Sequence, residues 1–216
     1  MFTRSAAIAA IATAAIGLGA CGDDGGGSST AELKSQLLPA SEVAGTKVER
    51  NFEWDNSIDF AVQGLPLPAE TKPSDTVSEI DDAGFDAAAG ENLVASKGSS
   101  FDGPRWTVVV VALGSDDDAK KLRDYFHGQD LKQPCFEVCS VNPSSIPVPG
   151  IPEAKGGQLV PQKDPPPNAP PPFTAYAVEF PIGSRLYVVN GGGAPGQIKK
   201  QQVLDAAKAL YERNSS

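Results

Sequence analysis

Hydrophobic and polar residues follow a similar pattern in two places along the chain, and each copy predicts two strands followed by a helix. In the first copy, the runs Glu91–Lys97 and Arg105–Leu113 flank a turn rich in glycine and serine, which predicts a hairpin. The segment Trp106–Leu113 is apolar at every position except Thr107. We therefore expect this strand to be covered on both faces of its sheet.

A helix is predicted directly after this hairpin. Ser115 stands three residues before Asp118, which is the spacing of a capping box, and the acidic first turn suits the positive end of a helix. The expected apolar side of this helix consists of Ala119, Leu122 and Phe126.

The second copy begins at Phe173. Its first strand, Phe173–Phe180, is joined to the partner strand Arg185–Asn190 by a tight turn over Ile182–Ser184. A glycine loop then leads into a helix predicted over Gln197–Arg213. On the first strand, Tyr176, Val178 and Phe180 are expected to lie on one face. The expected apolar side of the helix consists of Val203, Ala207, Leu210 and Tyr211.

The two units predict an α+β fold class, in which helices pack on an antiparallel sheet of about four to five strands. A duplicated strand-strand-helix unit would produce this arrangement. The domain is expected to span residues 31–216. Before the first unit, a short helix over Ala31–Leu38 is ended by Pro39, and Lys47–Gln63 is weakly strand-like, with Phe60 and Val62 on one face.

A stretch rich in proline and glycine, residues 131–172, separates the two units. Long loops of this kind are uncommon in compact domains, and polyproline runs lack internal hydrogen bonds. We expect a surface crossover between the two halves of the sheet.

The N-terminus has the pattern of an export signal. Arg4 precedes an apolar run over residues 6–18, and small residues follow before Cys21. The run is shorter than the roughly 20 apolar residues that a membrane-spanning helix needs. The glycine-rich residues after Cys21 have the composition of a flexible tether.

The tetrapeptide Leu18-Gly19-Ala20-Cys21 resembles the lipobox of bacterial lipoproteins. This resemblance implies a signal peptide over residues 1–20, a tether over 21–30, and acylation of Cys21 with a diacylglyceryl group. More than one acyl chain anchors a protein stably. The mature chain is then expected to be extracytoplasmic and attached to the cell membrane through its lipid.

Charge and cysteine content limit the function further. The chain has 18 basic and 27 acidic residues, a formal net charge of −9, and no basic stripe, which argues against nucleic acid as a partner. Cys135 and Cys139 are spaced to form a local disulfide in an exported protein. Their spacing also resembles the metal-binding loop of Sco-type copper chaperones, so a copper or thiol-redox factor remains an alternative.

No catalytic, cofactor or metal site is predicted. The run Gly191–Gly196 satisfies G-x-G-x-x-G, but the residues up to Ser216 leave no room for the second parallel strand and acidic residue of a dinucleotide site. His127 is the only histidine, and Ser115, Ser140 and Ser145 are its formal candidate partners. We expect His127 to be solvated at the end of its helix.

A wider resemblance rests on the lipobox, the tether, Ala83-Gly84-Phe85 before the first hairpin, and the segment Val148–Pro152. In these features the chain is similar to small exported lipoproteins of actinobacteria, several of which resemble the sensor domains of mycobacterial receptor serine/threonine kinases or Mog1/PsbP-like domains. The resemblance implies a sensor-like binding domain and brings no shared catalytic motif.

The predicted function is therefore binding without catalysis, either of an envelope protein or of a small hydrophobic ligand. A lipid carrier is an alternative. Trp106, Tyr176 and Tyr187 are candidate contact residues on an open face of the sheet beside the proline-rich loop, although the same aromatic residues would also suit a core.

Overall fold

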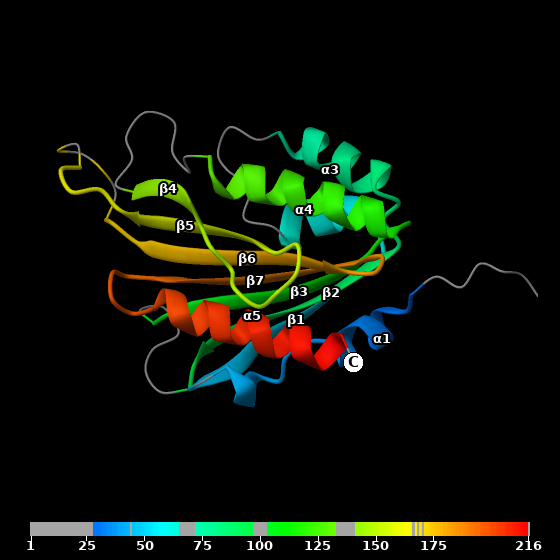
Figure 1. The fold of residues 1–216 in the computed structure, drawn as a ribbon, viewed down its shortest axis with the longest axis horizontal. Coiled ribbons are helices and arrows are strands. Elements are labelled where there is room, and N and C mark those ends of the chain that lie inside the picture. The colour runs from blue at the N-terminus through cyan, green and yellow to red at the C-terminus, as the bar shows by residue number, and fades with distance from the viewer. Residues whose placement is uncertain are drawn as a thin grey trace, which may run out of the picture.

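The structure is a computed structural model, and it describes residues 28–43, 45–64, 72–96, 103–132, 141–165, 167, 169 and 171–215. Its centre is one antiparallel sheet of seven strands in the order β1-β2-β3-β7-β6-β5-β4 (Figure 1). The strands are β1 (Thr46–Trp54), β2 (Ala87–Ala95), β3 (Arg105–Ala112), β4 (Val141–Ile146), β5 (Lys155–Pro161), β6 (Thr174–Ile182) and β7 (Arg185–Gly193). The α+β class predicted from the sequence is confirmed.

Helices cover both faces of this sheet, with α3 and α4 on one side and α1 and α5 on the other (Figure 1). The helices are α1 (Thr30–Ser35), α2 (Ser57–Asp59), α3 (Pro73–Asp82), α4 (Asp116–Asp130) and α5 (Lys200–Asn214), with short helical turns η1 (Ala40–Glu42) and η2 (Phe60–Gly64). Among the described residues, no helix is long and apolar enough to cross a membrane.

Both strand-strand-helix units form as predicted. β2 pairs with β3 before α4, and β6 pairs with β7 before α5. The units meet where β3 pairs with β7. The side chain of Ser115 caps α4 by accepting a hydrogen bond from the backbone N–H of Asp118 at 3.2 Å. The local signals of the sequence therefore place the four central strands correctly.

The sheet is larger than the expected four to five strands, because the stretch 131–172 contributes β4 and β5. The proline content of this stretch predicted a loop. Pro143 lies in β4, at the edge of the sheet, where the missing N–H of a proline is tolerated. β5 is held by pairing with β6, a contact between distant parts of the chain that no local pattern shows.

The segment 47–63, expected to be strand-like, changes conformation halfway. β1 ends at Trp54, and the side chain of Asn56 caps α2 by accepting from the N–H of Asp59 at 2.8 Å. In the helical turn that follows, Phe60 is buried and Val62 is exposed, so they do not share a face. The turn forms because Phe60 packs edge-on against Trp54.

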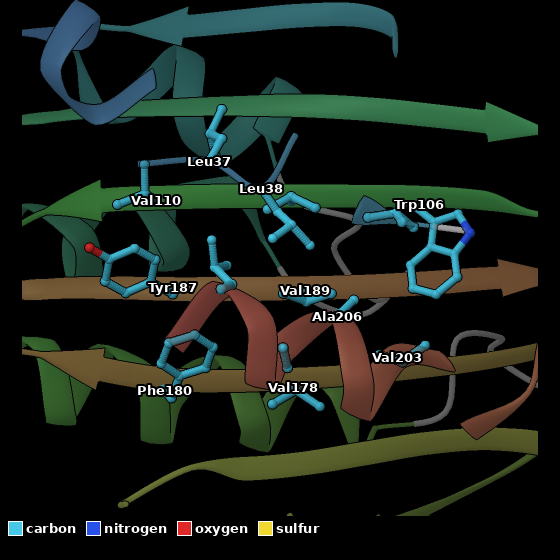
Figure 2. Packing of buried hydrophobic residues seen from close by; sticks show 14 of the residues in the cluster. Leu37, Leu38, Trp106, Val110, Val178, Phe180, Tyr187, Val189, Val203 and Ala206 are labelled. Atoms are coloured by element: carbon cyan, nitrogen blue, oxygen red, sulfur yellow. The ribbon is translucent and has the colours of Figure 1, made fainter. Parts of the chain in front are cut away.

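The core divides into two clusters, one on each face. On the α5 side, Trp106, Phe180 and Tyr187 pack with aliphatic residues from α1 and α5 (Figure 2). On the α4 side, Trp54 and Phe60 pack with apolar residues of α3, α4 and the central strands. Apolar cover on both faces is what the continuous hydrophobic run of β3 predicts.

Gly156 tests whether β4 and β5 pack as the structure shows. A Cβ atom at this position would lie 2.7 Å from side-chain carbons of both Ile146 and Val148 and 3.0 Å from the carbonyl oxygen of Ile146. We expect Gly156→Ala to lower the free energy of unfolding by about 1–3 kcal/mol, measured by chemical denaturation.

The matched control is Gly128→Ala. Gly128 lies in α4, and nothing lies within 4 Å of a Cβ atom there. Alanine should stabilise that helix by about 0.5–1 kcal/mol. Equal stability of Gly156→Ala and the parent protein would contradict the packing of β5.

Candidate functional site

A groove lies on the α4 side of the sheet because α4 is shorter than the strands beneath it. α4 has 15 residues, which corresponds to about 22 Å, whereas the nine residues of β6 or β7 span about 30 Å. α4 begins after the end of β3, runs back along the sheet, and ends near the row that contains Gly157. The strand ends beyond it form the floor of the groove.

The floor consists of two rows of residues that lie side by side across four strands, in the order β3, β7, β6, β5. Alanine and glycine occupy the middle of the outer row and the β6 and β5 positions of the inner row. The inner row is Thr107, Asn190, Ala177 and Gly157, and the outer row is Arg105, Gly192, Ala175 and Leu159. The groove is hollow because alanine and glycine leave space above the backbone.

The walls come from three other segments. Gln129, Asp130 and Lys132 stand at the end of α4, Phe173 and Tyr176 lie at the start of β6, and Ala194 and Gln197 follow β7; all of them line the groove. Its volume is about 680 Å³. A cavity of this size accommodates a small organic molecule.

Glu179 lies one row deeper than Ala177, between Val188 of β7 and Lys155 of β5 and beneath α4. It is 1% exposed, and neither carboxyl oxygen has a hydrogen bond of normal geometry. Burial raises the pKa of Glu179 from 4.5 to about 7. A carboxyl group in this position is therefore about half protonated at neutral pH.

Asp130, at the end of α4, is the neighbour of Glu179. A Cβ atom at position 157 would lie 3.4 Å from the Cβ of Asp130, so this side chain stands directly over Gly157 in the groove floor. Burial raises the pKa of Asp130 well above its usual range, and the nearby charge of Glu179 raises it further. Because two close carboxylates repel each other, the pair holds a shared proton at neutral pH.

His127 is enclosed rather than solvated, which corrects the expectation from the sequence. Its side chain is 13% exposed; Nδ1 lies 3.7 Å from Oε2 of Glu179, and Nε2 lies 3.3 Å from Oγ of Ser145 on β4. Burial lowers the pKa of His127, and the charge of Lys155 lowers it further. The imidazole is therefore neutral at pH 7, and it joins α4 to the edge of the sheet.

Ser145, His127 and Glu179 follow one another as the serine, histidine and carboxylate of a catalytic triad do in enzymes that transfer acyl groups. Two observations oppose such chemistry. The distance of 3.7 Å between Nδ1 and the carboxyl exceeds a hydrogen bond. A carboxyl with a pKa of about 7 also gives little support to an imidazolium ion. Among the described residues, no group of three or more His, Cys, Asp or Glu side chains is placed to hold a metal ion.

Of the three aromatic residues predicted to contact a ligand, only Tyr176 borders the groove, and its side chain packs against the α5-side cluster. Trp106 is 4% exposed and Tyr187 is 1% exposed, both on the opposite face (Figure 2). The hydroxyl of Tyr187 donates to Oε1 of Gln36 at 2.8 Å. These two side chains stabilise the core and are not available to a ligand.

Other predicted residues are either placed elsewhere or not described. The glycine loop expected after Asn190 is partly wrong, because Gly191, Gly192 and Gly193 continue β7 and pair with neighbouring strands. The chain turns only beyond them, at Gly196 with φ of 86°, before α5. Cys21, Cys135 and Cys139 lie outside the described residues, and so the acylation, disulfide and copper hypotheses remain predictions.

The carboxyl pair was missed in the sequence, although one signal was present. In the strand run Phe173–Phe180, Tyr176, Val178 and Phe180 were assigned to one face, and the other face then carries Ala175, Ala177 and Glu179. A charged residue in line with two small residues, on a strand flanked by apolar ones, indicates either an exposed face or a buried polar site. Whether this face is exposed or buried depends on where α4 packs, and the sequence around Glu179 does not show that.

Comparisons with known proteins establish the fold only. No protein-family model matches the chain, and no curated protein matches it. A solved structure, the extracellular domain of PknH from Mycobacterium tuberculosis, is similar with a TM-score of 0.54 and 16% sequence identity; the match covers 88% of this chain and 98% of that one. The similarity agrees, at the level of the fold, with the resemblance to mycobacterial sensor domains.

The carboxyl pair makes stability depend on pH in a defined direction. Folding raises the pKa of Glu179 from 4.5 to about 7, so its contribution to stability is fully present below pH 4.5 and is lost as the pH rises through 7. Between pH 5 and pH 8 the free energy of unfolding should fall in the parent protein. In Glu179→Gln we expect this fall to be smaller by about 2 kcal/mol.

The measurement is urea denaturation at a series of pH values. Glu79→Gln, an exposed change on α3, is the control and should follow the parent curve. Parallel curves for Glu179→Gln and the parent protein would show that Glu179 is not buried as described.

Proposed function

We propose that this protein is an extracytoplasmic, membrane-anchored domain that binds a small ligand in the groove beside the end of α4. The observation that carries the proposal is the groove itself, about 680 Å³ in volume, with a floor of small residues and polar groups at its inner end. Concave sites with a few placed polar groups are the usual form of a small-molecule site.

The proposed location rests on two independent features. The sequence carries the export signal and the lipobox-like tetrapeptide ending at Cys21. The similar solved structure is described as an extracellular domain. Both agree with a domain that meets its ligand outside the cytoplasm.

The composition of the lining favours a small polar molecule over an acyl chain. Among the described residues, Leu159 is the only large aliphatic one that lines the groove; the other apolar lining comes from alanine, glycine and the aromatic Phe173. A lipid carrier would need a long aliphatic cavity.

Filling the groove should abolish binding. A Cβ atom at position 192 meets its neighbours only at 3.4 Å or more, so Gly192→Phe can be accommodated while its ring occupies the groove. Fragments are screened by NMR of the isotope-labelled protein. We expect the binding fragments to shift the protein's backbone amide signals mainly at residues 157, 177 and 190–192. These shifts should be lost in Gly192→Phe.

The control for this screen is Gly128→Phe, which adds the same ring at an open position of α4 outside the groove lining. It should keep the affinities of the parent protein. Fragments that bind Gly192→Phe as well as they bind the parent would contradict the proposed site.

The anchor has a separate test. Mass spectrometry of the mature protein from a bacterial host should show an N-terminal Cys21 that carries lipid, and Cys21→Ser should move the protein from the membrane fraction to the soluble fraction. An unmodified N-terminus at another residue would overturn the proposed anchoring.

A further inference from the structure

We propose that the groove recognises the ammonium group of a small organic amine, held at the inner end by Asp130 with Glu179 and Asn190 beside it. The inference rests on the proposed function, since it names the chemical class of ligand for the same groove. It follows from the kind of polar atom that the structure leaves unsatisfied there.

Among the described residues, four buried side-chain atoms have no hydrogen-bond partner. One is Nδ1 of His127, which lies 3.7 Å from Oε2 of Glu179; the other three are acceptor oxygens, Oε1 and Oε2 of Glu179 and Oδ1 of Asn190. Asn190 and Ala177 are paired neighbours in the inner row, and Glu179 follows two residues after Ala177 on β6. Buried acceptors without donors are costly, and a bound group that donates would remove this cost. An ammonium group carries three donors and no acceptor.

The electrostatics at the inner end of the groove also favour a bound cation. Asp130 lines the groove and Glu179 lies behind it, so a cation held against Asp130 would offset the repulsion that holds a proton on the pair. The C-terminus of α4 ends at Asp130, and a helix C-terminus carries partial negative charge that also favours a cation.

The protein's own cations do not fill this role. Arg123 pairs with Asp124 and Glu153, and Lys155 pairs with Asp124 at 2.9 Å. His127 faces Glu179, but its pKa is lowered and the ring is neutral. These side chains pack around the carboxyl pair without a hydrogen bond of normal geometry to Glu179.

Two further cations line the groove. Arg105 lies in the outer row and pairs with Glu49 at 3.9 Å, and Lys132 follows the end of α4. Leu159 and Phe173 offer apolar and aromatic surface for the body of the ligand.

The experiment uses three probes of nearly equal shape: 2-phenylethylamine, 2-phenylethanol and 3-phenylpropionate. Each is titrated at pH 7.5 into the isotope-labelled full chain, and affinity is taken from the amide shifts of residues 157, 177 and 190–192. We expect the amine to bind at least fivefold more tightly than the alcohol and the carboxylate to bind most weakly. Because the amine displaces the shared proton, its affinity should fall severalfold between pH 7.5 and pH 5.5.

Asp130→Asn should bring the amine to the affinity of the alcohol and leave the alcohol unchanged, whereas Asp117→Asn, at the far end of α4, should keep the preference. Glu179→Gln serves as a second variant and should weaken the pH dependence, because burial still raises the pKa of Asp130. The inference is overturned if the alcohol or the carboxylate binds as tightly as the amine, if the preference survives in Asp130→Asn, or if none of the probes shifts the floor amides. The proposed function fails separately, when the fragment screen finds no molecule that Gly192→Phe excludes.

Discussion

The structure depends on one packing constraint, which is that the central strands need apolar cover on both faces while α4 covers only part of one. Val108 and Val110 of β3 are covered on the α5 side, and Val109 and Val111 are covered on the α4 side. Beyond the end of α4 the same face carries glycine, alanine and polar residues instead. Along β7 this face changes from Leu186 and Val188 to Asn190 and Gly192, and this change separates the core from the groove.

The carboxyl pair lies at the boundary between these two regions. Glu179 is far enough under α4 to lose its contact with water, yet Asp130 reaches the groove. Burying an ionisable group without a partner reduces stability. A site that binds a ligand can retain such a group because the bound ligand supplies the missing interaction, and this links the protonation of Glu179 to occupancy of the groove.

Much of the fold could be predicted from the sequence where the signal was local. The Ser115 cap, the run Trp106–Leu113 and the two hairpins all depend on residues close together in the chain, and all are confirmed. β4 pairs with β5, and β5 pairs with β6; neither pairing has a local signal, so the prolines and glycines of this stretch were interpreted as a loop. The groove could not be predicted because it depends on where α4 ends relative to four strands.

The most direct test of this account is carbon-13 NMR titration of the side-chain carboxyl of Glu179 in the labelled protein. The account predicts a midpoint near pH 7, because the group is buried beside Asp130, and a lower midpoint when 2-phenylethylamine saturates the groove. A midpoint at the ordinary value of an exposed glutamate, unchanged by the amine, would contradict both the burial of Glu179 and its connection to the groove.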